Sequence, residues 1–330
     1  DYGNDDARIV NSFFSRRDLE RLVEMRATRK PLATIEIPEY YLRQGETRQV
    51  RRRGDGVVEV WYKVGDYHRH DLAWPIQSLA DWREYKARHM QADDPTRFPD
   101  NWPELVASYQ NRDFPLQLTH RGVYGFCRNY LGDENLAYAF YDQPELVHAM
   151  MDDYTDMALA IWEKMVAEVD FDLIECWEDM AYRSGALISP QTFREFMTPQ
   201  YQKLATFARQ HHIPVILVDS DGYIEDLTGL MYEAGVTALY PYEVQSGNDV
   251  ARVRERFPQV GCLGGLNKEV MAEGPAAIDR ELDRARELIA LGRFIPGPDH
   301  FVLSNVSFAN YRYFMERLRE VCLTTQPGHD

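Results

Sequence analysis

The stretch PVILVDSDG, residues 214–222, decides the fold class. Its first five residues form a short apolar run, which predicts a strand buried in a sheet. Its last four, Asp219-Ser220-Asp221-Gly222, are acidic or small and follow that strand at once. An apolar strand that ends in ionisable residues is typical of an α/β protein, in which ligand sites lie beyond the carboxyl ends of the strands.

The same rhythm recurs along the rest of the chain. Short apolar runs stand at residues 115–118, 171–176, 214–218, 237–240, 260–263 and 294–296. Between most of them lie amphipathic stretches of helical character, at residues 145–168, 190–210, 249–257 and 278–291. Strands that alternate with helices predict βαβ units and a parallel sheet. Because the runs are continuously apolar, we expect both faces of the sheet to be covered.

Polar, ionisable or glycine-rich residues follow five of these strands in succession. They are residues 175–179, 219–222, 241–243, 264–268 and 298–300. An open, doubly wound sheet concentrates its ligand at one switch point, whereas a (β/α)8 TIM barrel gathers all its strand ends at one mouth. The pattern therefore predicts an α/β (β/α)8 TIM barrel, and an enzyme.

The first 110 residues have a different character. They contain a predicted helix at about 16–28, an apolar run at 32–37, and a predicted strand pair at 48–53 and 57–62. The segment Gly54-Asp55-Gly56 between the two strands favours a tight β-hairpin. Short acidic helices are expected among the prolines of residues 75–110. We predict that residues 1–110 are an N-terminal extension of helices and a hairpin, which packs on a barrel formed by residues 111–330.

Charge and composition exclude several classes of function. The chain of 330 residues has 37 Lys plus Arg against 53 Asp plus Glu, a net charge of −16. Such an acidic surface repels nucleic acid and anionic lipid, so neither is an expected partner. No apolar stretch approaches the roughly 20 residues that span a bilayer, and no signal-peptide pattern is expected. Four widely spaced cysteines are typical of reduced thiols, so the sequence predicts a cytoplasmic protein.

Acidic residues are the first candidates for chemistry. Asp219 and Asp221 stand two apart at a strand end, so their carboxylates point the same way. Such a pair can hold a metal, bind a cationic substrate or share a proton; alternatively, Asp221 caps the next helix and Asp219 bonds backbone amides. Glu178 and Asp179 can supply a general base, or can pair with Arg183 and shape their loop.

Histidine, lysine and aromatic residues complete the candidate site. His300, beside an acid after the last strand, suits proton transfer or metal ligation. An aromatic group around Glu243 can frame an apolar or quaternary-ammonium ligand, or simply line the rim. Its rings are Trp177, Tyr182, Tyr223 and Tyr240. Lys268 can meet an anionic group.

Together these motifs resemble the uroporphyrinogen decarboxylase superfamily. The resemblance rests on residues 178–190, 218–222, 241–243 and 264–268, and on Asp299-His300 with Asn310-Tyr311. It covers roughly residues 115–320 and implies a TIM barrel. The superfamily contains porphyrinogen decarboxylases, relatives of cobalamin-independent methionine synthase, and methyltransferases that work with corrinoid proteins.

Departures from the family patterns favour the methyltransferase-like branch. Porphyrinogen decarboxylases have an early RQAGRY motif, whereas this chain reads Leu42-Arg43-Gln44-Gly45-Glu46. Zinc-dependent methyltransferases have His-x-Cys where this chain has Asp219 and Asp221. The resemblance therefore implies either a divalent metal, such as zinc, on Asp219, Asp221 and His300, or a pocket without metal.

The sequence thus predicts a methyltransferase of this branch. It would demethylate a small methylated substrate, such as a methyl ether, amine or betaine, and pass the methyl group to a corrinoid protein. Asp219, Asp221, Glu178 and His300 are the predicted catalytic residues. Two alternatives stay open. One is a decarboxylase in which Lys268, Arg183 or Arg128 holds carboxylates; the other is a ligand-binding barrel without catalysis. Relatives favour a homodimer.

Overall fold

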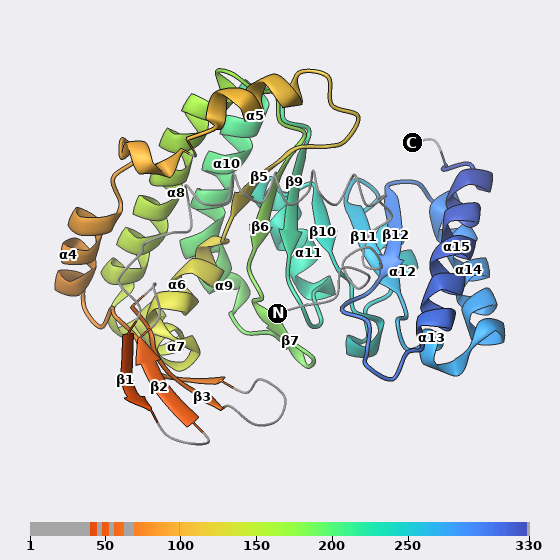
Figure 1. Cartoon of the computed structure of the whole chain (residues 1–330), viewed down its shortest axis with the longest axis horizontal. Helices are drawn as coiled ribbons and strands as arrows, with labels where there is room; N and C mark the ends of the chain where they lie inside the picture. Colours follow the sequence, from red (N-terminus) through yellow and green to blue (C-terminus); the bar gives the residue numbers. More distant parts are fainter. Residues whose placement is uncertain (1–39, 45–47, 53–55, 63–68, 99, 329–330) are drawn as a thin grey trace.

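A parallel sheet of six strands forms the centre of the molecule (Figure 1). The computed structural model describes residues 40–44, 48–52, 56–62, 69–98 and 100–328. The strands are β5 (Gln117–His120), β6 (Leu173–Trp177), β9 (Val215–Asp219), β10 (Ala238–Tyr240), β11 (Gly261–Leu266) and β12 (Phe294–Pro298). Each strand begins within two residues of a predicted apolar run, which confirms all six.

The order of the strands decides between the two α/β architectures. Across the sheet it runs β12-β11-β10-β9-β6-β5, so every strand pairs with its predecessor in the sequence. A doubly wound sheet reverses direction at a switch point, whereas a barrel continues in one direction. The fold is therefore α/β of the TIM-barrel class, as predicted, and the described residues contribute six parallel strands to it.

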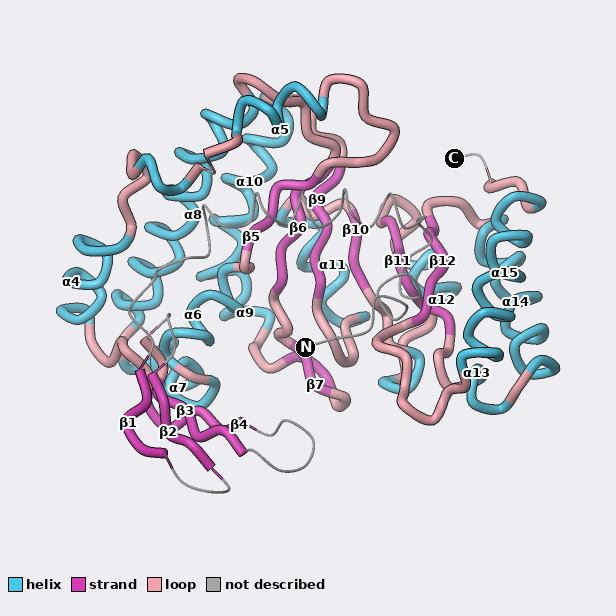
Figure 2. The backbone as a smooth tube through the Cα atoms, viewed as in Figure 1, coloured by secondary structure: helices cyan, strands magenta, loops and turns pink. Residues whose placement is uncertain are grey.

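Helices cover the outer face of this sheet (Figure 2). They are α6 (Val123–Leu131), α7 (Asp133–Asp142), α8 (Pro144–Val166), α9 (Pro190–Thr192), the π-helix η2 (Phe193–Met197), α10 (Thr198–Gln210), α11 (Glu225–Ala234), α12 (Val250–Arg256), α13 (Val270–Glu273), α14 (Pro275–Ala290) and α15 (Phe308–Thr324). The short 3-10 helix η3 (Val244–Ser246) belongs to the loop after β10. The predicted helices at 145–168, 190–210, 249–257 and 278–291 correspond to α8, α9 to α10, α12 and α14.

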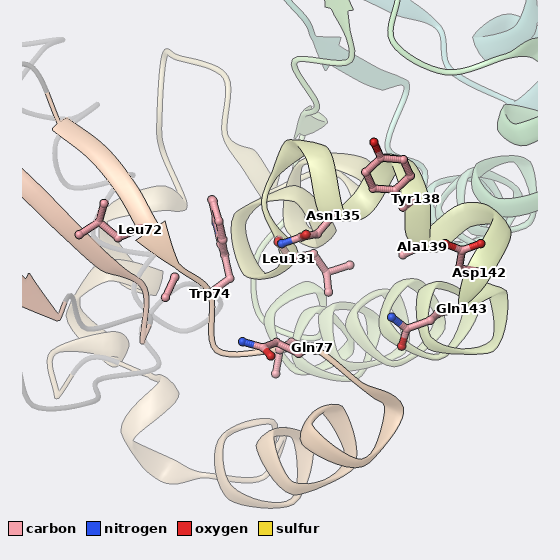
Figure 3. Close-up of a pocket in the computed structure, with 11 residues that line it drawn as sticks. Leu72, Trp74, Gln77, Leu131, Asn135, Tyr138, Ala139, Asp142 and Gln143 are labelled. Atoms are coloured by element: carbon pink, nitrogen blue, oxygen red, sulfur yellow. The ribbon is translucent and has the colours of Figure 1, made fainter.

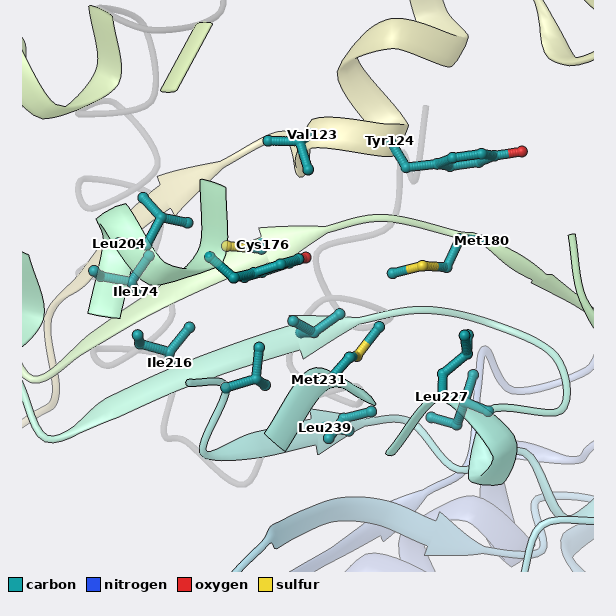
Figure 4. Packing of buried hydrophobic residues seen from close by; sticks show 14 of the residues in the cluster. Val123, Tyr124, Ile174, Cys176, Met180, Leu204, Ile216, Leu227, Met231 and Leu239 are labelled. Atoms are coloured by element: carbon teal, nitrogen blue, oxygen red, sulfur yellow. The ribbon is translucent and has the colours of Figure 1, made fainter. Parts of the chain in front are cut away.

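The two faces of the sheet are buried unequally. Ile174 and Cys176 of β6 point to the helices and are fully buried, in the core drawn in Figure 4. Glu175 and Trp177 point to the inner face and are only partly buried. On β12, Ile295 is 61% exposed. The helix-covered face is therefore more deeply buried than the inner face, which also carries the polar side chain of Glu175.

An antiparallel sheet precedes the parallel one. It has the order β1-β2-β3-β4, with β1 (Tyr40–Gln44), β2 (Arg48–Arg52), β3 (Val58–Tyr62) and β4 (Arg69–Ala73). Strands β2 and β3 pair as the predicted hairpin, with Arg48 opposite Tyr62. Strands β1 and β4 have no counterpart among the predicted elements. The predicted helix at 16–28, the run at 32–37 and the hairpin residues Gly54 and Asp55 lie outside the described residues.

Short helices connect this sheet to the barrel. They are α4 (Leu79–His89), η1 (Pro95–Arg97) and α5 (Trp102–Tyr109). The indole Nε1 of Trp82 donates to Asp153 of α8 at 2.9 Å, which holds α4 against the barrel. The domain boundary near residue 110 stays a prediction.

Two global features concern the predicted environment. All four cysteines lie in the described part of the chain and none is disulfide-bonded, as predicted. Over the residues that the structure describes, no helix is both long enough and apolar enough to cross a membrane.

Candidate active site

The ends of β6, β9 and β10 form one continuous edge. The Cα atoms of Trp177, Asp219 and Tyr240 are partners across these strands. Just beyond the edge, the backbone N–H of Glu178 donates to Asp219 O at 2.8 Å, and that of Ser220 donates to Tyr240 O at 2.9 Å. The ladder thus extends one residue past each strand, so the side chains that follow are held in fixed relative positions.

Three aspartates from two of these strand ends meet. Asp179, Asp219 and Asp221 each place one carboxylate oxygen within 4.8 Å of the others. The backbone N–H of Asp221 donates to Asp179 Oδ1 at 3.3 Å. Asp179 itself has a left-handed backbone with φ of 46°, a conformation that is uncommon away from glycine and occurs often at functional sites.

Asp219 has the most perturbed carboxyl of this group. Burial, followed by the nearby charges of Glu175, Asp221 and Asp179, raises the pKa of Asp219 to about 8. Like charges that crowd together cannot all ionise, so one of the carboxyls keeps its proton. At neutral pH Asp219 is therefore a proton donor, unless a cation binds beside it.

A second group shares Asp221. Oxygens of Asp221 and Glu243 and a ring nitrogen of His300 lie within 4.8 Å of one another. His300 Nε2 is 3.1 Å from Asp221 Oδ2, and this hydrogen bond raises the pKa of His300. Glu243 also accepts the N–H of Gly222 at 2.8 Å, and Lys268 Nζ lies 3.7 Å from its other oxygen.

The predicted metal ligands are divided between these two groups. Asp219 belongs to the first and His300 to the second, and Asp221 joins them. Among the described residues, His300 groups with Asp221 and Glu243 and not with Asp219, so the trio Asp219, Asp221 and His300 does not form one such group. A metal on these residues stays a prediction. Asp179, Asp219 and Asp221 offer only oxygen, which suits magnesium or manganese better than zinc. The second group offers nitrogen and oxygen, but the Lys268 ammonium beside Glu243 opposes a cation there.

Glu178 lies apart from both groups. Its side chain is fully buried, and its carboxylate accepts the N–H groups of Val123 and Gly125 at 2.9 Å and the hydroxyl of Tyr201. Burial raises the pKa of Glu178 to about 7 even though these hydrogen bonds oppose the shift. The carboxylate holds the first turn of α6, as a structural anchor does. Its predicted catalytic role stays a prediction.

Trp177 faces two cations of the protein. The guanidinium groups of Arg128 and Arg121 lie 5.0 Å and 5.7 Å from the centre of its ring. Arg128 also donates to the carbonyl of Asp179 at 2.7 Å and lies 3.6 Å from its carboxylate. The predicted contact of Trp177 with a substrate cation would therefore compete with these arginines.

The predicted tyrosines lie in two different places. Tyr240 is partly buried, and burial, then the charge of Asp219, raises its pKa to about 12. Tyr182 is 69% exposed on the hairpin of β7 (Ala181–Tyr182) and β8 (Gly185–Ala186), and its carbonyl accepts the N–H of Tyr223. Tyr240 therefore borders the aspartates, whereas Tyr182 and Tyr223 lie along the hairpin. The substrate-binding roles stay predictions.

Three residues at the mouth were not among the predicted site residues. Glu175 stands two residues before Trp177 on the inner face, a position that strand alternation would have identified. Arg121 follows β5, which is not one of the five strands whose following residues were identified as polar, ionisable or glycine-rich. Asp299 is fully buried and accepts the N–H groups of Val244 and Lys268, so it joins two loops of the mouth.

A cavity of about 390 Å³ lies elsewhere, between the antiparallel sheet and α7 (Figure 3). Trp74, Leu131, Asn135 and Tyr138 are among its lining residues. None of the predicted site residues lines it, so the strand ends remain the candidate active site.

Comparisons with known proteins agree with this fold. Two proteins named uroporphyrinogen decarboxylase, from Prochlorococcus marinus strains NATL2A and NATL1A, are 26% and 25% identical over 186 residues. The match covers 55% of this chain and 49% of each of theirs, so the chain spans about half the length of these curated relatives. A solved structure, the methyltransferase from Methanosarcina mazei, has a TM-score of 0.56 at 15% identity. That likeness covers 89% of this chain and 77% of the other, and it shows the fold.

The sequence profile of one enzyme family covers most of the barrel. The profile described as Uroporphyrinogen decarboxylase (URO-D) matches residues 131–321, from the end of α6 to α15. These residues are more than half of the chain and include both groups that meet at Asp221. The chain therefore belongs to the uroporphyrinogen decarboxylase family.

Proposed function

We propose that this protein is a methyltransferase that takes a methyl group from a small substrate in the barrel mouth and passes it to the corrinoid of a partner protein. The observation that supports this most is the state of Asp219. Its carboxyl has no ion pair among the described residues and is crowded by Asp179 and Asp221. A proton donor thus stands at the mouth of the barrel at neutral pH.

A methyl ether needs such a donor. When the bond between the methyl carbon and oxygen breaks, the oxygen keeps the electron pair and leaves as an alkoxide or phenolate. Proton transfer from Asp219 to that oxygen makes it a better leaving group. The corrinoid supplies the nucleophile that accepts the methyl group. Asp221, which lies within 4.8 Å of Asp219 and is hydrogen-bonded to His300, would then pass a proton back to Asp219.

A divalent metal could supply the same help. Asp179, Asp219 and Asp221 would hold it, and it would polarise the leaving oxygen as a Lewis acid. In that case Asp219 would bind as a carboxylate, because a cation among the three aspartates removes the reason for a retained proton.

The test compares substrates whose leaving groups differ. Transfer to a reduced corrinoid protein is measured for methyl ethers, methylamines and betaines, with the wild type and Asp219→Asn. We expect the variant to transfer from ethers about 100-fold more slowly. Transfer from a quaternary ammonium should change little, because a tertiary amine leaves without a proton. Asp226→Asn, an exposed acid on α11, is the matched control. If the wild type transfers no methyl group from any of the three substrate classes, the proposal is refuted.

Decarboxylation is the second candidate, and the names of the sequence relatives favour it. Asp219 would then protonate carbon as CO2 leaves, while Lys268 or the arginines hold substrate carboxylates. Against this candidate, the chain lacks the RQAGRY motif of porphyrinogen decarboxylases. The described residues of the segment that stands in its place, Leu42–Gln44, lie in β1 of the antiparallel sheet. Release of labelled CO2 from carboxyl-labelled substrates would favour this candidate over methyl transfer.

A further inference from the structure

Two arginines of one segment gather at a single aromatic ring in the mouth. Arg121 follows β5 and Arg128 lies in α6, and both guanidinium groups approach the ring of Trp177, at 5.7 Å and 5.0 Å. Two like charges around one indole repel each other, so this arrangement has a cost unless an anion compensates it.

The compensation within the protein is incomplete. Arg128 has Asp179 at 3.6 Å and the exposed Asp133 at 3.9 Å. Arg121 is exposed, and over the described part of the chain no carboxylate lies within 4.0 Å of its guanidinium.

The arginines stand next to the aspartates. Trp177 and Asp219 are partners on neighbouring strands, whose spacing is about 4.8 Å. Asp179 lies between the arginines and the other aspartates, since its carboxylate is 3.6 Å from Arg128 and within 4.8 Å of those of Asp219 and Asp221. The mouth therefore has a cationic side and an acidic side separated by about the width of one side chain.

We propose that Arg121, with Arg128, forms an anion subsite that binds a carboxylate of the substrate. The inference rests on the proposed function, because it places the methyl group on the acidic side, at Asp219. A guanidinium binds a carboxylate through paired hydrogen bonds. A phosphate dianion fits less well, because the neighbouring aspartates repel two charges more than one. The substrate class is thus a small methylated carboxylic acid.

The test measures binding separately from turnover. Calorimetry compares ligand pairs that differ in the carboxylate: methoxyacetate with 2-methoxyethanol, 4-methoxybenzoate with 4-methoxybenzyl alcohol, and trimethylglycine with choline. The wild type should bind the carboxylate of at least one pair about ten-fold more tightly than its neutral or cationic partner. Arg121→Gln should remove that preference. Arg83→Gln, at an exposed arginine on α4, makes the same charge change away from the mouth and should retain it.

The outcomes separate this inference from the proposed function. A preference that survives in Arg121→Gln, or that is absent from all three pairs in the wild type, overturns the anion subsite, whatever the methyl-transfer assay gives. Arg121-dependent carboxylate binding without methyl transfer would keep the subsite and reject the methyltransferase.

Discussion

His300 Nε2 lies 3.1 Å from Asp221 Oδ2, although the two residues are 79 positions apart in the sequence. The contact joins the loop after β9 to the loop after β12, across the ends of β10 and β11. Asp221 is consequently the only residue common to the two groups of possible metal ligands among the described residues. Substitution of Asp221 should therefore weaken metal binding in both groups, whereas substitution of any other member should weaken it in only one.

Metal binding should therefore depend most on Asp221. We expect Asp221→Asn to weaken binding of Mn²⁺ by about ten-fold or more. Asp219→Asn should weaken it in the oxygen-only group, and His300→Ala should leave that group nearly intact. Elemental analysis of the purified protein and titration calorimetry with Mn²⁺ and Zn²⁺ would measure this. Equal losses in Asp221→Asn and the surface control Asp226→Asn would contradict it.

The arrangement of the site was partly predictable from the sequence. Parallel strands place their carboxyl ends at one edge, so acids that follow β9 and a histidine that follows β12 had to lie near one another. Spacing could not show that Asp221, and not Asp219, bonds His300, because that depends on how the loops after β9 and β12 approach each other.

Glu178 shows how adjacent residues can mislead. Glu178 and Asp179 both follow β6, but strand alternation from Glu175 and Trp177 places Asp179 on the inner side and Glu178 on the helix side. The sequence predicts a catalytic role for Glu178 and a substrate-binding role for Asp179, but it does not show that the two side chains lie on opposite sides of the sheet. Arg121 was missed for another reason: its proximity to Trp177 depends on how the chain turns after β5 into α6, which no local pattern encodes.

The anchor role of Glu178 separates stability from catalysis. Glu178→Gln loses one of the two oxygens that accept N–H groups at the start of α6, so we expect a cost of about 1–3 kcal/mol in the free energy of unfolding. Turnover of the folded variant should stay within a few-fold of the wild type. Urea unfolding and the methyl-transfer assay measure the two effects. Glu316→Gln, at an exposed glutamate of α15, is the control. Lost turnover at unchanged stability would instead make Glu178 catalytic.

Gly122 should be intolerant of a side chain. Its φ is 70°, and a Cβ there would collide with the Glu178 carboxylate and lie 2.5 Å from the carbonyl oxygen of Trp177. Gly274 has a similar backbone, with φ of 106°, but a Cβ there meets nothing within 4 Å. Both alanine variants carry backbone strain of about 1–3 kcal/mol, and only Gly122→Ala adds the collision. We expect Gly122→Ala to have a clearly lower Tm than Gly274→Ala. Equal Tm values would contradict the close packing of the Glu178 carboxylate against the start of α6.

His120 should set part of the acid limit of stability. It is fully buried between Tyr154 and Trp162, and neither ring nitrogen has a hydrogen-bond partner among the residues that the structure describes. Burial lowers the pKa of His120 from 6.5 to about 3. Between these values the unfolded chain binds a proton that the folded protein does not, so stability falls as the pH falls below 6.5.

Replacing His120 by an apolar ring should remove this loss. At pH 5, 1.5 pH units below 6.5, the histidine costs about 2 kcal/mol relative to its contribution at neutral pH. We therefore expect His120→Phe to gain about that much on the wild type between pH 7.5 and pH 5, measured by urea unfolding. The free energy of unfolding at pH 7.5 serves as the internal control, because it already includes any cost of packing the larger ring. His120→Leu gives a second shape at the same position. Parallel pH dependences of the wild type and both variants would show that His120 takes up its proton in the folded protein.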